Sequence, residues 1–184
     1  MKVCGLDLSL TGSGVAVVEW FPAHPGGTPG VRVEEYGSRP TTADLAARGA
    51  RLRKVATPVI SRCQNADLVM VEDLFMGAGT GAQLDRAGLW WIIVNSLTAA
   101  GVPVVPVTNN HLKMLAVGKG GGAGTDKAHV IAACVKRYGH LTDINSDNCA
   151  DALVLADAGA RHLGFPLTDL PETHLRGQRA IKFP

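Results

Sequence analysis

The pattern of apolar and polar positions predicts strands near the start of the chain and helices over most of its later part. Residues 1–7 alternate and are apolar, and a turn-rich segment joins them to a β-rich run at residues 14–21, which is typical of a hairpin. A Pro/Gly-rich loop at residues 22–30 precedes a third predicted strand at residues 31–36. The pattern therefore predicts three consecutive antiparallel strands.

Further along the chain, short apolar runs alternate with helical patterns. Two runs, at residues 68–72 and 102–107, predict buried strands. Helices are predicted at residues 42–64, 83–99, 109–117 and 147–162, and from a cap at residue 125 or 126 to residue 138. Residues 164–184 are expected to form an irregular tail. This order predicts one α/β domain at residues 1–163, in which helices flank a mixed sheet.

Composition indicates an ordinary globular protein. The chain has 184 residues, 46% of them hydrophobic, and a formal net charge of +2 at pH 7, which excludes a disordered chain. It has no apolar run long enough to span a membrane and no secretion signal, so we expect a soluble, cytoplasmic protein without a membrane partner. The cysteines are too widely spaced for zinc or redox motifs and are expected to be reduced core residues: Cys4, Cys63, Cys134 and Cys149.

Two groups of large apolar residues are candidates for contact with a partner. The predicted helix at residues 83–99 is apolar on nearly every side, so it is expected to be buried in the domain or in an oligomer interface. Trp90 and Trp91, in the middle of this helix, are assigned to the interface or the core. Phe75 and Met76 precede a glycine-rich loop and are expected either to fill the core or to stack on unpaired bases.

Three acids lie in or next to elements that the pattern predicts to be buried. Asp7 is within the first strand, Glu72 ends the strand at residues 68–72, and Asp151 has apolar neighbours in the last helix. A carboxylate buried alone among apolar groups is unfavourable unless a cation or a donor pairs with it. If these elements are neighbours, the three carboxylates can bind one hard divalent cation such as Mg²⁺. The alternative is that each acid is separately exposed at a strand end or in a cap.

Basic residues gather between residues 109 and 140, where one acid, Asp126, accompanies five cations: Lys113, Lys119, Lys127, Lys136 and Arg137. Lys127 is the most informative, because a cation in the first turn of a helix opposes the helix dipole. A phosphate bound by both the helix N-terminus and this ammonium group would explain its position, and a solvated lysine is the alternative. The glycine-rich loop at residues 118–124 does not fit the nucleotide-binding P-loop pattern.

Four short blocks, in order along roughly residues 1–160, resemble the RuvC-type Holliday junction resolvases. The blocks are Gly5-Leu6-Asp7-Leu8-Ser9, Val71-Glu72-Asp73-Leu74-Phe75-Met76, Val117-Gly118 followed by Asp126-Lys127-Ala128, and Ala150-Asp151-Ala152-Leu153. The resemblance implies an RNase H-like fold with a mixed five-stranded sheet. It further implies a homodimeric endonuclease that uses Mg²⁺, or Mn²⁺ in its place, to cut four-way or branched DNA on opposing strands.

The resemblance also implies roles for individual residues. Asp7, Glu72 and Asp151 would be catalytic metal ligands, and Lys127 would contact the scissile phosphate. The other DNA-binding residues would be Lys113, Lys119, Phe75 and Met76, with Phe75 near the crossover. The helix used for dimerisation in the family matches the predicted helix at residues 83–99, whose interface residues would be Leu84, Trp90, Trp91 and Val94.

The chain departs from the family pattern at Asn148, where the family usually has an acid or a histidine. Asp147 and Asn148 precede Asp151 by four and three residues, so either can share its side of the helix. An acid at a helix start is favoured as a cap and by the helix dipole. We therefore expect Asp147 to cap the helix and the amide oxygen of Asn148 to be the fourth metal ligand.

Two other functions are compatible with the sequence. A non-catalytic module that binds branched DNA is one, because Asn148 weakens the metal site. An actin-like ATPase is the other, because Asp7 and the turn after it also resemble the first phosphate loop of those proteins; they have two duplicated halves, and 184 residues hold one. A chain this rich in alanine and glycine suits a bacteriophage or a GC-rich bacterium, and the sequence does not indicate a helicase partner.

Overall fold

The computed structural model describes residues 1–21, 28–40, 44–74 and 81–183. This part of the chain forms five strands and six helices, with the following bounds: β1 Lys2–Asp7, β2 Ser13–Glu19, β3 Gly30–Tyr36, α1 Leu45–Cys63, β4 Leu68–Glu72, α2 Gly81–Ala99, β5 Val104–Val107, α3 Asn109–Val117, α4 Lys127–Tyr138, α5 Asp147–His162 and α6 Glu172–Ala180.

The five strands form one mixed sheet in the order β3-β2-β1-β4-β5. The first three strands are antiparallel neighbours, whereas β4 lies parallel to β1 and β5 lies parallel to β4. The predicted α/β architecture and mixed sheet are therefore confirmed. Because β1 and β4 are parallel neighbours with Leu6 opposite Val71, the next residues along each strand, Asp7 and Glu72, reach the same edge of the sheet.

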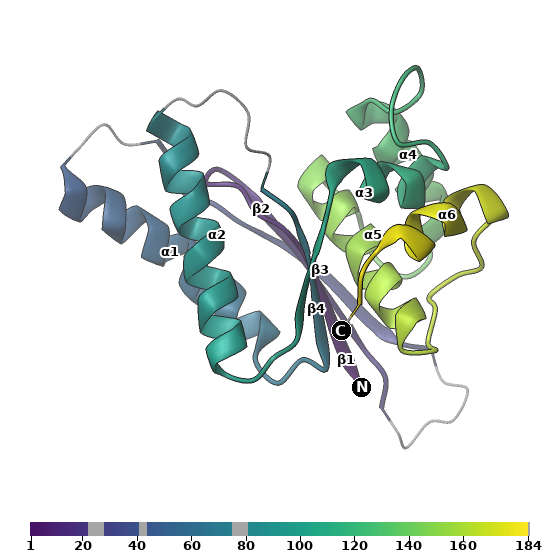
Figure 1. Cartoon of the computed structure of the whole chain (residues 1–184), viewed down its shortest axis with the longest axis horizontal. Coiled ribbons are helices and arrows are strands. Elements are labelled where there is room, and N and C mark those ends of the chain that lie inside the picture. The colour runs from purple at the N-terminus through teal and green to yellow at the C-terminus, as the bar shows by residue number, and fades with distance from the viewer. Residues whose placement is uncertain (22–27, 41–43, 75–80, 184) are drawn as a thin grey trace.

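Helices cover both faces of the sheet (Figure 1). The helices α1 and α2 lie on one face, and α3, α4, α5 and α6 lie on the other, so the sheet separates two apolar cores. The helix α5 packs directly on β1: a Cβ atom on Gly5 would lie 1.9 Å from the carbonyl oxygen of Ala152. Glycine is therefore required at this crossing, which brings the first half of α5 next to the end of β1.

The predicted helices and strands are confirmed, with small shifts at the ends of some elements, and the predicted free, buried cysteines are also found. The expectation of an irregular C-terminal tail is wrong, because residues 172–180 form α6. This helix is polar and short, but Gly177 lets it approach α3 so closely that a Cβ atom there would lie 2.9 Å from the carbonyl oxygen of His111. Tertiary contact therefore stabilises a helix that its apolar pattern does not indicate.

Two predicted features fall outside the described residues. They are most of the Pro/Gly-rich loop, at residues 22–27, and the pair Phe75 and Met76. Within the described ranges, no helix combines the length and apolar character needed to cross a membrane.

Candidate active site

Two carboxylates meet at the edge of the sheet where β1 and β4 end. Asp7 is the last residue of β1 and is buried, with 7% of its surface exposed. Glu72 is the last residue of β4, and its side chain is hydrogen-bonded to that of Asp7. The parallel pairing of two apolar strands thus brings together two acids that are 65 residues apart in the sequence.

A third carboxylate reaches this region from α5. Asp151 lies in the first half of that helix, next to the close crossing of α5 over β1. Its Oδ1 atom is buried and has no hydrogen-bond partner among the described residues. Buried carboxylate oxygens are normally paired, so an orphaned one indicates a missing cation or donor.

Burial and neighbouring carboxylates raise the pKa values of Asp7 and Asp151. Burial, together with the hydrogen bond and the charge of Glu72, raises the pKa of Asp7 to about 9. The charge of Asp151 acts in the same direction, whereas that of Arg86 lowers this pKa. Burial, followed by the charges of Glu72 and Asp147, raises the pKa of Asp151 to about 7. A bound divalent cation would remove this repulsion, so the electrostatics of the site fit such an ion.

The three carboxylates are not yet arranged around one point. No group of three His, Cys, Asp or Glu side chains in the described part of the chain has the arrangement of a complete metal site. Glu72 also accepts a hydrogen bond from Nδ2 of Asn109, at 2.8 Å, through its Oε1 atom. Side-chain adjustment is therefore needed before the three carboxylates can share a cation.

Basic side chains lie beside Asp151 in a cavity of about 280 Å³ between α3, α4 and α5. Lys113 of α3 and Lys127 of α4 both line it, and their charges lower the pKa of Asp151. Lys127 forms an ion pair with Asp147, but its side chain is 82% exposed and accessible to a ligand. The cavity thus combines a carboxylate that fits a metal with two cations that fit phosphate.

The start of α5 differs from the prediction. Ser146 is the N-cap, and its side chain accepts a hydrogen bond from the backbone N–H of Cys149. The expectation that Asp147 caps the helix is therefore wrong: with serine one residue earlier, Asp147 falls inside the first turn and pairs with Lys127. Asn148 lies against the turn after β1, since a Cβ atom on Gly12 would be 3.1 Å from its Nδ2 atom. Its role as a metal ligand stays a prediction.

The apolar residues of α2 divide between the core and the surface. Trp90 and Val94 are buried and pack against the sheet, which fits the core alternative for Trp90, and their place in a dimer interface stays a prediction. Leu84 and Trp91 are 70% and 61% exposed, and Ile92 lies on the surface beside them. The apolar pattern could not separate these sets, because large apolar residues lie both on the side of the helix that covers the sheet and on its exposed side.

Two residues near the site were missed by the sequence analysis. The indole Nε1 of Trp90 donates a hydrogen bond to the backbone carbonyl of Glu72, at 3.0 Å, and so fixes the end of β4. Arg86 of α2 is close enough to lower the pKa of Asp7. A half-buried arginine in a helix with many apolar residues was the available signal. Lys119, a predicted DNA contact, is exposed after α3 and does not line the cavity beside Asp151.

The sequence matches no family model and no curated protein. The structure is similar to that of Thermus thermophilus RuvC, with a TM-score of 0.65 and 22% identity over 89% of this chain and 97% of that one. It is also similar to T. thermophilus RuvC in complex with Holliday junction substrate (TM-score 0.65, 18% identity, 89% and 96% covered). A third similar structure is the Fowlpox virus resolvase in complex with Holliday junction DNA, with a TM-score of 0.55 and 14% identity over 89% of this chain and 99% of that one. The predicted RNase H-like fold of the RuvC type is thereby confirmed.

Proposed function

We propose that this protein is a structure-selective endonuclease that cuts four-way or branched DNA, as a Holliday junction resolvase does. One observation carries the proposal: the carboxylates of Asp7, Glu72 and Asp151 are close enough to interact, and Asp151 lines a cavity that Lys113 and Lys127 also line. Acids suited to a metal and cations suited to phosphate are the groups that phosphodiester hydrolysis requires. The shared fold with resolvases that bind junction DNA supports the choice of substrate.

The carboxylates would hold Mg²⁺, for which Mn²⁺ could substitute. The orphaned Oδ1 atom of Asp151 and the raised pKa values of Asp7 and Asp151 fit such a cation. When bound, a pair of ions would activate a water for in-line attack and stabilise the leaving 3′-oxygen, which gives 5′-phosphate and 3′-hydroxyl ends. Glu72, which is anchored through its backbone by Trp90, would exchange Asn109 for the metal.

The two lysines would bind and orient the substrate. Lys127 lies at the start of α4, where the carboxylate of the N-cap Asp126 already accepts the backbone N–H of His129, so the exposed ammonium group of Lys127 would make the phosphate contact. It would exchange Asp147 for the phosphate, and this exchange is easy because ion pairs at exposed lysines are weak. Lys113 would contact a neighbouring phosphate from the opposite wall of the cavity, and Lys119 would add a contact outside it.

The exposed apolar face of α2 supports a homodimer. Leu84, Trp91 and Ile92 place large apolar side chains on one surface of this helix. Contiguous apolar surface of this kind marks a protein interface, and a two-fold dimer buries the same patch of both copies. Two active sites related by two-fold symmetry would also match the two equivalent strands of a four-way junction.

A non-catalytic module that binds branched DNA is the second candidate. The absence of a complete three-acid cluster among the described residues favours it, as does the neutral Asn148 at the family's acidic position.

The actin-like ATPase has less support. The turn after β1 uses its own polar groups: the N–H of Gly12 donates to Ser9 Oγ at 3.0 Å, and the N–H of Ser9 donates to Ser13 Oγ at 3.1 Å.

End-labelled four-way junction, flap and linear duplex, each incubated with and without Mg²⁺, test the proposal. We expect symmetric nicks near the crossover of the junction, only with the metal present, and little cutting of the linear duplex. Asp7→Asn should abolish cleavage but retain junction binding in Ca²⁺. Junction binding without cleavage by the unaltered protein would establish the non-catalytic module instead, and equal cutting of all three substrates would overturn junction selectivity.

A further inference from the structure

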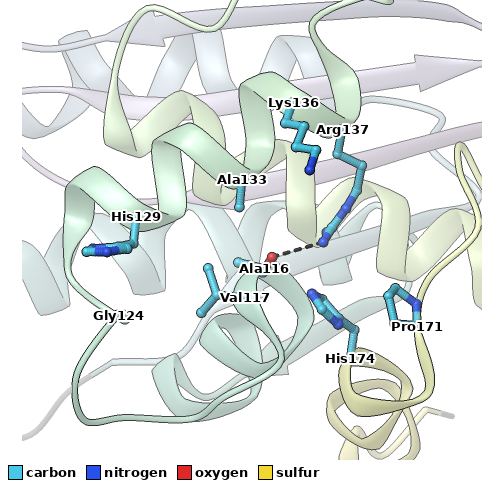
Figure 2. Close-up of a pocket in the computed structure, with 9 residues that line it drawn as sticks. All are labelled: Ala116, Val117, Gly124, His129, Ala133, Lys136, Arg137, Pro171 and His174. Carbon is cyan, nitrogen blue, oxygen red and sulfur yellow. Dashed lines mark hydrogen bonds between the residues drawn. The ribbon is translucent and has the colours of Figure 1, made fainter.

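A second hollow lies on the helical side of the sheet, outside the candidate active site. Its volume is about 530 Å³, and it opens between the end of α3, the outer face of α4 and the start of α6 (Figure 2). A volume of this size is typical of sites for small ligands. None of its lining residues lines the cavity beside Asp151, so α3 and α4 contribute to two separate sites.

Four of the nine residues that line the hollow are basic. They are Lys136 and Arg137 from the last turn of α4, His174 from α6, and His129 from the first turn of α4. No acidic residue of the described chain is among the lining residues. Asp126 pairs with the ring of His129, at 2.8 Å. Glu172, next to Pro171, pairs with Arg179 rather than with a cation of the hollow. Figure 2 shows Lys136 and Arg137 extending towards the ring of His174.

The guanidinium group of Arg137 is held in place. Its Nη1 atom donates to the carbonyl oxygen of Leu115 and its Nη2 atom to that of Ala116, both at 3.0 Å. These carbonyls belong to the last turn of α3, so the arginine completes the end of that helix. A guanidinium with five N–H donors retains others for a ligand, and a fixed orientation lowers the entropy lost on binding.

The imidazole ring of His174 lies close to the positive charge of Arg137. The ring is half-buried, and its Nδ1 atom lies 3.1 Å from the hydroxyl of Thr173. Burial and the charge of Arg137 lower its pKa and outweigh a hydrogen bond to the backbone of Ala116, which raises it. An anion bound between the two side chains would reverse this effect. A planar guanidinium, an ammonium and an imidazole that converge on one hollow are suited to a phosphate group.

We propose that this hollow binds a phosphate group of the sugar-phosphate backbone of one arm of branched DNA. This inference rests on the proposed nuclease function, but it concerns a contact away from the cavity beside Asp151. It also assigns a function to α6, which supplies His174 and Pro171 to the lining. Free phosphate or a mononucleotide has the same phosphate chemistry, and the NMR experiment below distinguishes these small ligands from DNA.

Junction affinity tests the contact directly. Binding of a labelled four-way junction is measured in Ca²⁺ over a series of KCl concentrations for the wild type, Lys136→Ala and His174→Gln. Losing one phosphate contact should weaken binding by roughly threefold to tenfold, and Lys136→Ala should lower the slope of log affinity against log salt by about one. The matched control is Lys54→Ala, which removes an exposed lysine from α1 on the other face of the sheet and should leave the slope unchanged.

Proton NMR of the His174 ring identifies the source of the phosphate. The probes are inorganic phosphate, a deoxynucleoside monophosphate and the junction, and binding should raise the pKa of this histidine. A shift with the junction and weaker junction binding by both variants support the proposal, whereas a shift with small phosphates and unchanged junction affinity overturns DNA as the source. No shift with any probe and wild-type affinity of both variants overturn the site. A protein that binds no branched DNA but shows the shift with phosphate would refute the proposed function and not the phosphate site.

Discussion

Asp7 occupies a position where ionisation works against folding. Its carboxyl group is buried beside Glu72 and Asp151, and its pKa rises from 3.8 to about 9. The folded chain therefore holds this proton more tightly than the unfolded chain does. The stabilisation is fully present below about pH 4 and is lost as the pH rises towards 9. Near neutral pH without metal, the buried Asp7 carboxyl therefore lowers the free energy of unfolding. Destabilising groups of this kind are typical of functional sites.

Asp7→Asn should therefore stabilise the metal-free protein while abolishing cleavage. In EDTA at pH 7.5 we expect the melting temperature to rise by roughly 5 °C, because the wild-type carboxyl must take up a proton on folding at this pH, whereas the amide is neutral in both states. The gain should shrink as the pH approaches 4, where the wild-type carboxyl is already protonated. Thermal melts by circular dichroism across this range measure the effect. Asp143→Asn, at an exposed position, is the control and should show no gain. A pH-independent gain would contradict the assignment.

Substitutions of Asn148 and Asp147 should change the Mg²⁺ concentration needed for cleavage to different extents. A neutral ligand leaves one fewer negative charge in the site, so Asn148→Asp should lower the Mg²⁺ concentration for half-maximal cleavage, by about threefold or more. Asp147→Asn removes the partner of Lys127 rather than a ligand, so it should change this concentration little. A Mg²⁺ titration of junction cleavage for both variants is the measurement. A large shift with Asp147→Asn alone would show that Asp147 is the ligand.

At the scale of elements, the C-terminal segment is attached to α5 by a buried polar cluster. Asp157 is 1% exposed and accepts hydrogen bonds from the hydroxyl of Tyr138 and the backbone N–H of Leu167, both at 2.8 Å. Arg161 pairs with the same carboxylate at 3.2 Å and also donates to the carbonyl of Thr168. This cluster fixes the chain that leads from α5 to α6.

Asp157→Ala should loosen that attachment. It leaves a buried hydroxyl, an N–H group and a guanidinium without their acceptor, which should cost roughly 3 kcal/mol and lower the melting temperature by about 10 °C. Limited proteolysis should then cut first within residues 164–171. Asp169→Ala, which removes an exposed carboxylate from the same segment, should behave like the wild type. Unchanged stability and proteolysis of Asp157→Ala would show that the cluster does not hold α6.

The elements were predictable where they carry a strong local pattern. The apolar runs around Asp7 and Glu72 indicated strands, and their parallel pairing brought the two acids together as expected. The helix α6 was not predictable, because Gly177 and the acceptor at Asp157 act through distant residues. The cap at Ser146 was missed because two adjacent residues can both cap a helix, and only the backbone decides between them. Contacts between distant residues thus determined α6, whereas the local backbone determined the cap at Ser146.

For the whole molecule, the exposed apolar face of α2 predicts a dimer, and measuring the oligomeric state tests this part of the proposed function. Trp91, with Leu84 and Ile92 beside it, presents apolar surface that an isolated chain leaves in water. Trp91→Asp should convert a dimer at micromolar concentration into a monomer in sedimentation velocity, because a charge at the centre of an apolar interface is strongly unfavourable. Val135→Asp is the matched control, since Val135 is 47% exposed on α4 and the variant should stay dimeric.

The same variant should change the products of junction cleavage. A dimer holds two active sites on one junction and cuts both equivalent strands during one binding event, which converts a supercoiled cruciform plasmid directly to the linear form. A monomer cuts one strand, which releases the supercoiling and removes the cruciform before the second cut. Trp91→Asp should therefore give nicked circles while Val135→Asp gives linear product. A wild-type protein that sediments as a monomer, or linear product from monomeric Trp91→Asp, would contradict a dimer formed through α2.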